Sequence, residues 1–265
     1  MKIKIVLFFF ALIVVFSCDK ENSVVEDTTI VVKQDSVEKE DSLVEDTIVV
    51  VKQDTINIQD YNLDARELYY REVYNDSTHF NYNNYLLDTT EINKIFKLID
   101  AIFKLKIPER DSVFIKHKIH SRFCVSYQTL NLKVKTNLPE IQNLVNNVIP
   151  TGNENLDYLL KKYNFDSVRT IFNYPEFPWL TIYTPSVYNM LPIQKEFRKL
   201  PFVAYAEMNM WCFDGNNITL KRDKESATIT FSIGSGDCPA GCIHHKYWEF
   251  RVKSDIAEFI RTYER

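Results

Sequence analysis

The sequence LTIYTPSVYNMLPIQKEFRKLPFVAYAEMN, residues 180–209, predicts a strand, a helix and a second strand. Leu180–Thr184 and Phe202–Asn209 are rich in β-branched and aromatic side chains, which favour extended backbone. Between them, Leu191–Leu200 places apolar residues at helical spacing. This stretch therefore predicts one strand–helix–strand unit.

The preceding residues predict a second unit of the same kind. Leu132–Thr136 has the alternation of a strand, residues 154–163 supply a helix, and Val168–Tyr174 form a strand. The sequence PEFP at residues 175–178 predicts a turn into the next strand. Residues 131–210 thus have the order of a ferredoxin-like split βαβ region, and we expect an α+β fold.

One segment of this region resembles a known family. RKLPFVAYAEMN, residues 198–209, is similar to the ending L-x-x-V-x-x-A-E-x-N of subtilisin-type propeptides and their stand-alone inhibitor relatives. The resemblance implies a ferredoxin-like fold and, as one alternative function, inhibition of a protease through a free tail. The matching residues are Leu200, Val203, Ala206, Glu207 and Asn209.

The residues on either side predict further elements. In residues 61–130 we expect a helix near Leu63–Tyr74, a helix capped by Asp88 and ended by Pro108, and strands from the alternation over Val113–Ile119 and Phe123–Tyr127. In residues 211–265 we expect a small antiparallel β unit. Its strands are predicted at Asn217–Lys221, Ala227–Ile233 and Tyr247–Val252, followed by a C-terminal helix that Ser254 caps, with Ile256, Phe259, Ile260 and Tyr263 on one face.

The amino-terminal residues 1–18, MKIKIVLFFFALIVVFSC, have the basic start and short apolar run of a secretory signal. The run is shorter than the roughly 20 apolar residues that a spanning helix needs. Val15-Phe16-Ser17-Cys18 resembles the lipobox of Bacteroidota-type lipoproteins. That resemblance implies removal of the signal peptide, residues 1–17, and acylation of Cys18. The membrane would then be a partner through this lipid anchor, and the protein would lie in the cell envelope, at the outer membrane.

Residues 18–60 have the composition of a tether. The sequence VVEDTTIVVKQDSV begins at Val24 and recurs from Leu43 as LVEDTIVVVKQDTI. Residues 1–60 carry 6 Lys against 12 Asp and Glu, and residues 19–60 contain no aromatic residue. Such a segment buries too little apolar surface to offset its ordering entropy, so we expect a disordered, self-repelling linker. Pairing of the two Val-rich patches as strands is the alternative.

The tether also holds five triplets of Asp, a hydroxyl residue and an apolar residue or Thr. They resemble the O-glycosylation sequon of exported Bacteroidota proteins, although the composition of an acidic linker would produce them as well. The candidate acceptors are Thr28, Ser36, Ser42, Thr47 and Thr55.

Beyond residue 60 the chain carries 26 basic and 24 acidic side chains, so it is close to neutral. This balance gives no electrostatic reason to expect nucleic acid binding. The sequence lacks G-x-S-x-G, H-E-x-x-H, P-loop and G-x-G-x-x-G motifs, and we expect no cofactor.

The densest cluster of reactive side chains is GSGDCPAGCIHHKYWEF, residues 234–250. Its G-D-C-P-x-G-C run resembles a C-terminal segment of uncharacterised Bacteroidota lipoproteins, which implies no activity. Pro239 and Gly241 can bend the chain, so we expect a disulfide between Cys238 and Cys242. A zinc site formed with His244 or His245, and a nucleophilic thiol, are the alternatives. The sequence leaves Cys124 and Cys212 open, either paired or as buried thiols.

Taken together, these features predict a lipid-anchored binding or structural module of the cell envelope without catalytic activity. An envelope protein or a glycan would be its partner. A propeptide-like protease inhibitor is one alternative. A metal- or thiol-dependent enzyme at Cys238, Cys242 and His244 is the other.

Overall fold

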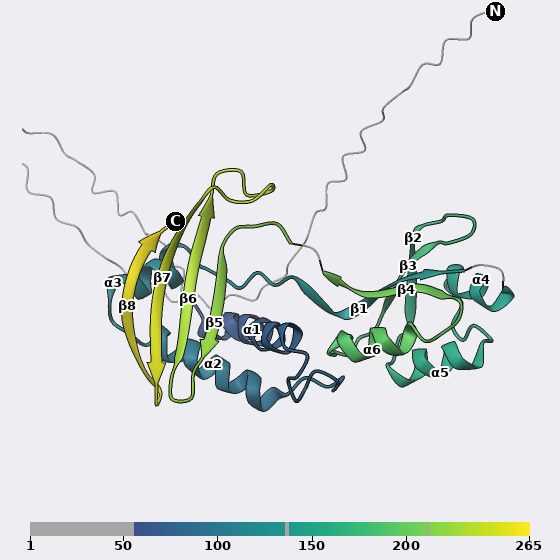
Figure 1. Ribbon diagram of the computed structural model, residues 1–265, viewed down its shortest axis with the longest axis horizontal. Helices are drawn as coiled ribbons and strands as arrows, with labels where there is room; N and C mark the ends of the chain where they lie inside the picture. The colour runs from purple at the N-terminus through teal and green to yellow at the C-terminus, as the bar shows by residue number, and fades with distance from the viewer. Residues whose placement is uncertain (1–55, 136–137, 211) are drawn as a thin grey trace, which may run out of the picture. The chain divides into compact units, whose positions relative to one another are not determined.

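The structure, a computed structural model, describes residues 56–135, 138–210 and 212–265. Within these ranges it contains helices α1–α6 and two four-stranded antiparallel sheets, which confirms the expected α+β class (Figure 1). The predicted signal, Cys18, the five candidate acceptors and the repeated part of the tether lie outside the described residues. Among the described residues, no helix is both long and apolar enough to cross a membrane.

The first sheet has the strand order β2-β3-β1-β4, and each neighbouring pair is antiparallel. The predicted order of strand, helix, strand, strand, helix, strand is confirmed, and one further helix, α4, begins at Pro139. The elements are β1 Val125–Val134, α4 Pro139–Val145, α5 Glu154–Lys162, β2 Ser167–Phe172, β3 Trp179–Tyr183, α6 Met190–Phe197 and β4 Val203–Met210.

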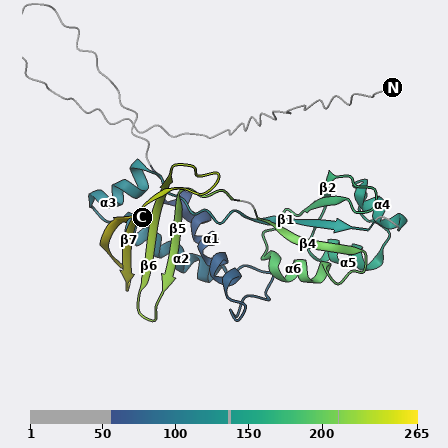
Figure 2. The ribbon, with the colours of Figure 1, turned by 45° about the horizontal axis from the view of Figure 1, so that its top comes forward.

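Apolar alternation decides which side of the first sheet the helices cover. In β1, Leu130 and Leu132 are fully buried, whereas Asn131 and Lys133 between them are only partly buried. Both views of the ribbon place α5 and α6 together on one side of this sheet (Figures 1 and 2). Because successive side chains of a strand point to opposite faces, Asn131 and Lys133 belong to the face away from these helices.

The second sheet has the order β5-β6-β7-β8, with all neighbouring strands antiparallel. The predicted hairpin and third strand are confirmed, and the sheet has a fourth strand. Helices α1 and α2 pack together, and α2 contacts β7 and β8. The elements are η1 Ile58–Tyr61, α1 Asn62–Asn75, α2 Thr89–Phe103, β5 Asn217–Arg222, β6 Ala227–Ser235, β7 His244–Lys253 and β8 Ile256–Glu264.

The predicted C-terminal helix is wrong, because residues 256–264 form strand β8. Ser254 and Asp255 have φ angles of 49° and 64°, and Lys253 pairs with Ile256, so the two residues form a tight hairpin turn. The ladder has a register shift in which Phe250 pairs with Phe259 and Glu249 with Arg261. Ile260 is therefore an extra residue, and this bulge gives the apolar positions of β8 a spacing that imitates a helix.

The strand predicted over Val113–Ile119 is also wrong. Pro108 is the first residue of helix α3, Pro108–Asp111, and a π-helical turn follows over Ser112–Lys116. Val113 and Phe114, which are consecutive, are both fully buried, and Ile115 is 48% exposed. Two adjacent buried side chains fit a helical turn better than a strand, where they would alternate. The predicted helix near residues 63–74 is confirmed, and so is the helix capped by Asp88. The second helix ends at Phe103, before Pro108, so its predicted end is wrong.

Residues 125–210 are inserted in the sequence between two segments that pack with each other. Phe114 from the first segment contacts Phe231 from the second, with ring centroids 5.2 Å apart. The inserted region contacts this assembly through α1, where the Tyr70 and Tyr127 rings lie 5.4 Å apart. It also does so through α6, whose capping residue Asn189 donates a hydrogen bond of 2.8 Å to the Asn84 carbonyl.

Candidate functional site

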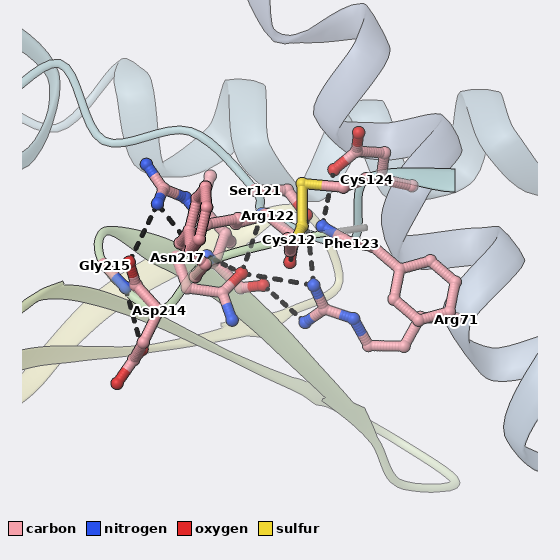
Figure 3. Close-up of a disulfide and its surroundings, with 12 residues drawn as sticks. Arg71, Ser121, Arg122, Phe123, Cys124, Cys212, Asp214, Gly215 and Asn217 are labelled. Atoms are coloured by element: carbon pink, nitrogen blue, oxygen red, sulfur yellow. Dashed lines mark hydrogen bonds between the residues drawn. A yellow bond between two sulfur atoms is a disulfide. The ribbon is translucent and has the colours of Figure 1, made fainter. Parts of the chain in front are cut away.

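A disulfide joins the two points where the chain leaves and re-enters the second-sheet assembly. Cys124 precedes β1 and Cys212 follows β4, and their Cα atoms lie 5.7 Å apart (Figure 3). The Asn217 carboxamide oxygen accepts hydrogen bonds from the Arg122 backbone N–H at 2.9 Å and from the Arg71 guanidinium at 3.1 Å. The sequence left this pairing open, and the structure shows that these two cysteines are not free thiols.

One face of α1 holds residues 120–123 in place. Asp64 and Glu67 lie three residues apart and Arg71 four further on, so all three project from the same side of the helix. Asp64 accepts a hydrogen bond from the Ser121 N–H, and Glu67 accepts one of 3.1 Å from the Phe123 N–H. Burial raises the pKa of Glu67. These contacts order the joint between the two sheets, and we read them as structural.

His120 forms a second polar contact at this joint. Its Nδ1 lies 2.8 Å from Oδ2 of the buried Asp64, and its ring stacks on Tyr61 with centroids 4.5 Å apart. The hydrogen bond to Asp64 raises the pKa of His120, and burial opposes this with a smaller effect. The pair joins residues 56 positions apart, so sequence spacing could not reveal it.

The predicted disulfide between Cys238 and Cys242 is confirmed, and it closes a loop at the end of the β6–β7 hairpin. Gly241 within the loop has a φ of 121°, which glycine adopts readily. Asp214 supports the loop from outside, because its Oδ2 accepts a 2.8 Å hydrogen bond from the Cys242 N–H. This contact and others with Gly215 and His245 lower the pKa of Asp214.

The structure tests which residues of this loop come together as possible metal ligands. Asp214, Cys242 and His245 offer one ligand atom each, and these atoms lie within 4.8 Å of one another. The Cys242 sulfur is in a disulfide bond and has no thiolate to offer a metal. His244 and Cys238 are not in this group. The donor set that remains is one carboxylate and one imidazole, so it does not fit the four-coordinate zinc site that the sequence left as an alternative.

A row of aromatic side chains crosses the face of the first sheet opposite α5 and α6, which we call the open face. Lys133 of β1 pairs in register with Trp179 of β3 and with Tyr205 of β4, and Trp179 pairs with Phe172 of β2. The Trp179 and Tyr205 ring centroids are 5.3 Å apart, and Phe172 is 56% exposed. We call the three aromatic residues Phe172, Trp179 and Tyr205, together with Lys133 between the last two, the aromatic row.

A polar row lies beside it, two residues along strands β1, β3 and β4 and three along β2, where the register shifts. Asn131 pairs with Thr181 and Glu207, and Thr181 pairs with Arg169. The Thr181 hydroxyl donates a 2.8 Å hydrogen bond to the Asn131 carboxamide oxygen, which fixes the orientation of the amide. In the described part of the chain, the Arg169 guanidinium and the Glu207 carboxylate have no ion pair or hydrogen bond.

A hollow of about 430 Å³ lies beside the two middle residues of the aromatic row, Trp179 and Lys133, at the β2–β3 turn. The Lys133 ammonium lies over two of the rings, 5.3 Å from the centroid of Phe177 and 5.6 Å from that of Trp179. The Lys133 ammonium group therefore lines one side of the hollow. The lining residues are Lys133, Tyr174, Pro175, Glu176, Phe177 and Trp179.

Sequence reasoning identified these strands but missed the open face as a candidate site. The signal was present in the alternation of Trp179 and Tyr183 with buried Leu180 and Ile182. An aromatic residue on the outward side of a strand is unremarkable alone. Only the strand order β2-β3-β1-β4, which the sequence does not state directly, aligns the four outward residues into a row.

The structure also bears on the resemblance to propeptide inhibitors. The segment after Asn209 leads at once to Cys212, whose sulfur is bonded to Cys124. It then continues into β5. The tail that such an inhibitor would insert into a protease is therefore held at both ends in this chain. Comparison with protein-family models, with curated proteins and with solved structures found no match to the chain.

Proposed function

We propose that the protein is a lipid-anchored binding module of the cell envelope, without catalytic activity, whose binding surface is the open face of the first sheet. The observation that carries this is the partly exposed aromatic row, which lies beside Arg169 and Glu207. Within the described residues, these two side chains have no ion pair or hydrogen bond. On the outward face of the second sheet, by contrast, charges pair across strands, as Arg261 does with Glu249 at 2.9 Å. A surface whose polar groups are already paired has less to offer a ligand than one whose groups are not.

The location rests on two independent features. The signal and Cys18 resemble those of exported, acylated proteins, and the body holds two disulfides, which form in oxidising compartments. The finer fold is part of the proposal: the order β2-β3-β1-β4 with α5 and α6 on one side is the arrangement expected of a ferredoxin-like split βαβ region. The four cysteines of residues 56–265 form two disulfides, so Cys238 and Cys242 have no free thiol to act as a nucleophile.

The anchor is tested by labelling the cells with an alkyne-modified palmitate and detecting the label on the protein. The wild-type chain should take up the label and begin at Cys18, and the Cys18→Ser variant should take up none. Absence of label from the wild-type chain would remove the anchor from this proposal. Intact mass of the same sample shows whether sugars are attached at Thr28, Ser36, Ser42, Thr47 or Thr55.

Binding is tested by co-sedimentation with washed cell-envelope fragments. A chain that begins at residue 19 is used throughout, so that neither the lipid nor the apolar signal carries the protein down. Combining it with Trp179→Ala and Tyr205→Ala should leave most of the protein in the supernatant. Tyr247→Ala and Tyr263→Ala, which remove a stacked pair from the second sheet, are the matched control and should leave binding intact. Equal sedimentation of both variants would contradict the role of the open face.

A further inference from the structure

The geometry points to a neutral polysaccharide as the ligand of the open face, and this inference rests on the proposed function above. Sugar rings have an apolar face of C–H groups and an edge of hydroxyl groups. A protein surface that recognises them must therefore place flat apolar groups and hydrogen-bonding groups side by side. The aromatic row and the polar row supply these two kinds of group on neighbouring positions of the same four strands.

The length of the aromatic row favours a chain of sugars over a single one. The row crosses four strands, which lie about 4.8 Å apart, so its ends are separated by roughly 14 Å. Phe172 stands at one end and Tyr205 at the other, with Trp179 between them. The hollow of about 430 Å³ beside Phe177 and Trp179 widens this strip near its middle. A short run of sugar units along the row would contact all of these rings.

The charges on and beside the two rows balance. Arg169 and Lys133 are positive, and Glu207 and Glu176 are negative, so the surface has no excess of either sign. A polyanion such as nucleic acid would need a clear positive excess, and a wholly apolar partner would leave Arg169 and Glu207 desolvated without partners. Hydroxyl groups, which both donate and accept, can satisfy all of these side chains. Charge complementarity thus selects an uncharged ligand rich in hydroxyl groups.

The polar row has the side chains that bind hydroxyl groups in fixed directions. The amide of Asn131 is oriented by the hydroxyl of Thr181, which leaves its nitrogen to donate. The Glu207 carboxylate can accept two hydrogen bonds and the Arg169 guanidinium can donate several, both in planar geometry. Two neighbouring hydroxyl groups of a sugar can together donate two hydrogen bonds to the carboxylate or accept two from the guanidinium.

The experiment is isothermal titration of the full acylated chain, held in a detergent without a sugar headgroup, with three neutral hexasaccharides: cellohexaose, chitohexaose and mannohexaose. At least one should bind, and Trp179→Ala and Tyr205→Ala should each weaken that binding about tenfold or more. Asn131→Ala and Glu207→Gln should weaken it as well. Tyr263→Ala, on the second sheet, should leave the affinity within about twofold.

A second readout covers the case in which an alanine variant is unstable. In the wild-type chain, the ligand that binds should protect tryptophan emission from quenching by acrylamide, and Trp179→Phe should retain binding but lose that protection. No heat from any of the three sugars at millimolar concentration would overturn the inference. So would binding that Trp179→Ala and Tyr205→Ala leave unchanged. If the sugars fail but envelope fragments still sediment the protein through the open face, the binding module stands and its ligand is of another class, such as a protein.

Discussion

The rings of Trp179 and Tyr205 meet although their strands are not neighbours. Both residues pair with Lys133 of β1, which lies between β3 and β4, so their backbones are roughly 9.6 Å apart. The ring centroids nevertheless lie only 5.3 Å apart. The two rings must therefore lean toward each other over the Lys133 stem, so that aromatic side chains of β3 and β4 meet across the intervening strand β1.

This contact predicts energetic coupling between the two rings. In a double-mutant cycle of urea unfolding, Trp179→Ala and Tyr205→Ala should couple by about 0.5–1.5 kcal/mol. Tyr174→Ala is the control for the cycle, because Tyr174 contacts Phe172, 6.0 Å between centroids, and should be additive with Tyr205→Ala. Additivity of the Trp179 and Tyr205 variants would show that the rings do not meet in solution.

The two disulfides should differ in their effect on stability. A disulfide restricts the unfolded chain more when the closed loop is longer. Cys124 and Cys212 are 88 positions apart, whereas Cys238 and Cys242 are 4 apart. Chain entropy gives about 4–5 kcal/mol for the first and about 2 kcal/mol for the second. Guanidinium unfolding of Cys124→Ala/Cys212→Ala and Cys238→Ala/Cys242→Ala checks this, and equal losses would contradict it.

Stability should fall as the pH rises above the ordinary range of histidine. The hydrogen bond to Asp64 raises the pKa of His120 above 6.5, so the folded state binds this proton more tightly than the unfolded state does. The resulting stabilisation is complete below the unfolded pKa and is lost as the pH rises through the folded one. Thermal unfolding of His120→Gln across this range should show a flatter profile than wild type, and a profile as steep as that of wild type would contradict the contribution of this pair.

The turn between β7 and β8 predicts a stabilising substitution. Ser254 and Asp255 both have left-handed backbone conformations, which Asn and Gly adopt at lower cost. Ser254→Asn combined with Asp255→Gly should raise the free energy of unfolding by about 0.5–1 kcal/mol. Lys224→Gly, in the β5–β6 turn where φ is not positive, is the control and should lower stability. A loss of stability in the double variant would favour a helix over residues 254–264.

Local sequence patterns were sufficient for the elements of the first sheet. Strands β1 and β2 contain register shifts, but the alternation beside the shifts is regular enough to indicate strands. Helices α5 and α6 begin after the capping residues Asn153 and Asn189. Patterns failed where a single residue changed the periodicity. The bulge at Ile260 made a strand resemble a helix, and the π-helical turn after Pro108 made a helix resemble a strand.

The candidate site depends on relationships that no local pattern contains. The Cys238–Cys242 bond was predictable because both residues lie in one short loop. The Cys124–Cys212 bond and the His120–Asp64 contact join residues far apart in the chain, so they follow only from the tertiary fold. The aromatic row is of this kind as well, since it takes one residue from each of four strands.

The insertion of residues 125–210 between two packed segments has a consequence for how the chain folds. The elements α1 and α2 must meet strands β5–β8 across that whole stretch, and closing so long a loop costs entropy before any contact is made. Pairing of β1 with β4 would bring Cys124 and Cys212 to within a few ångströms and so shorten the search. The inserted region would then fold first. Its folding would bring helices α1 and α2, which precede it, close to strands β5–β8, which follow it.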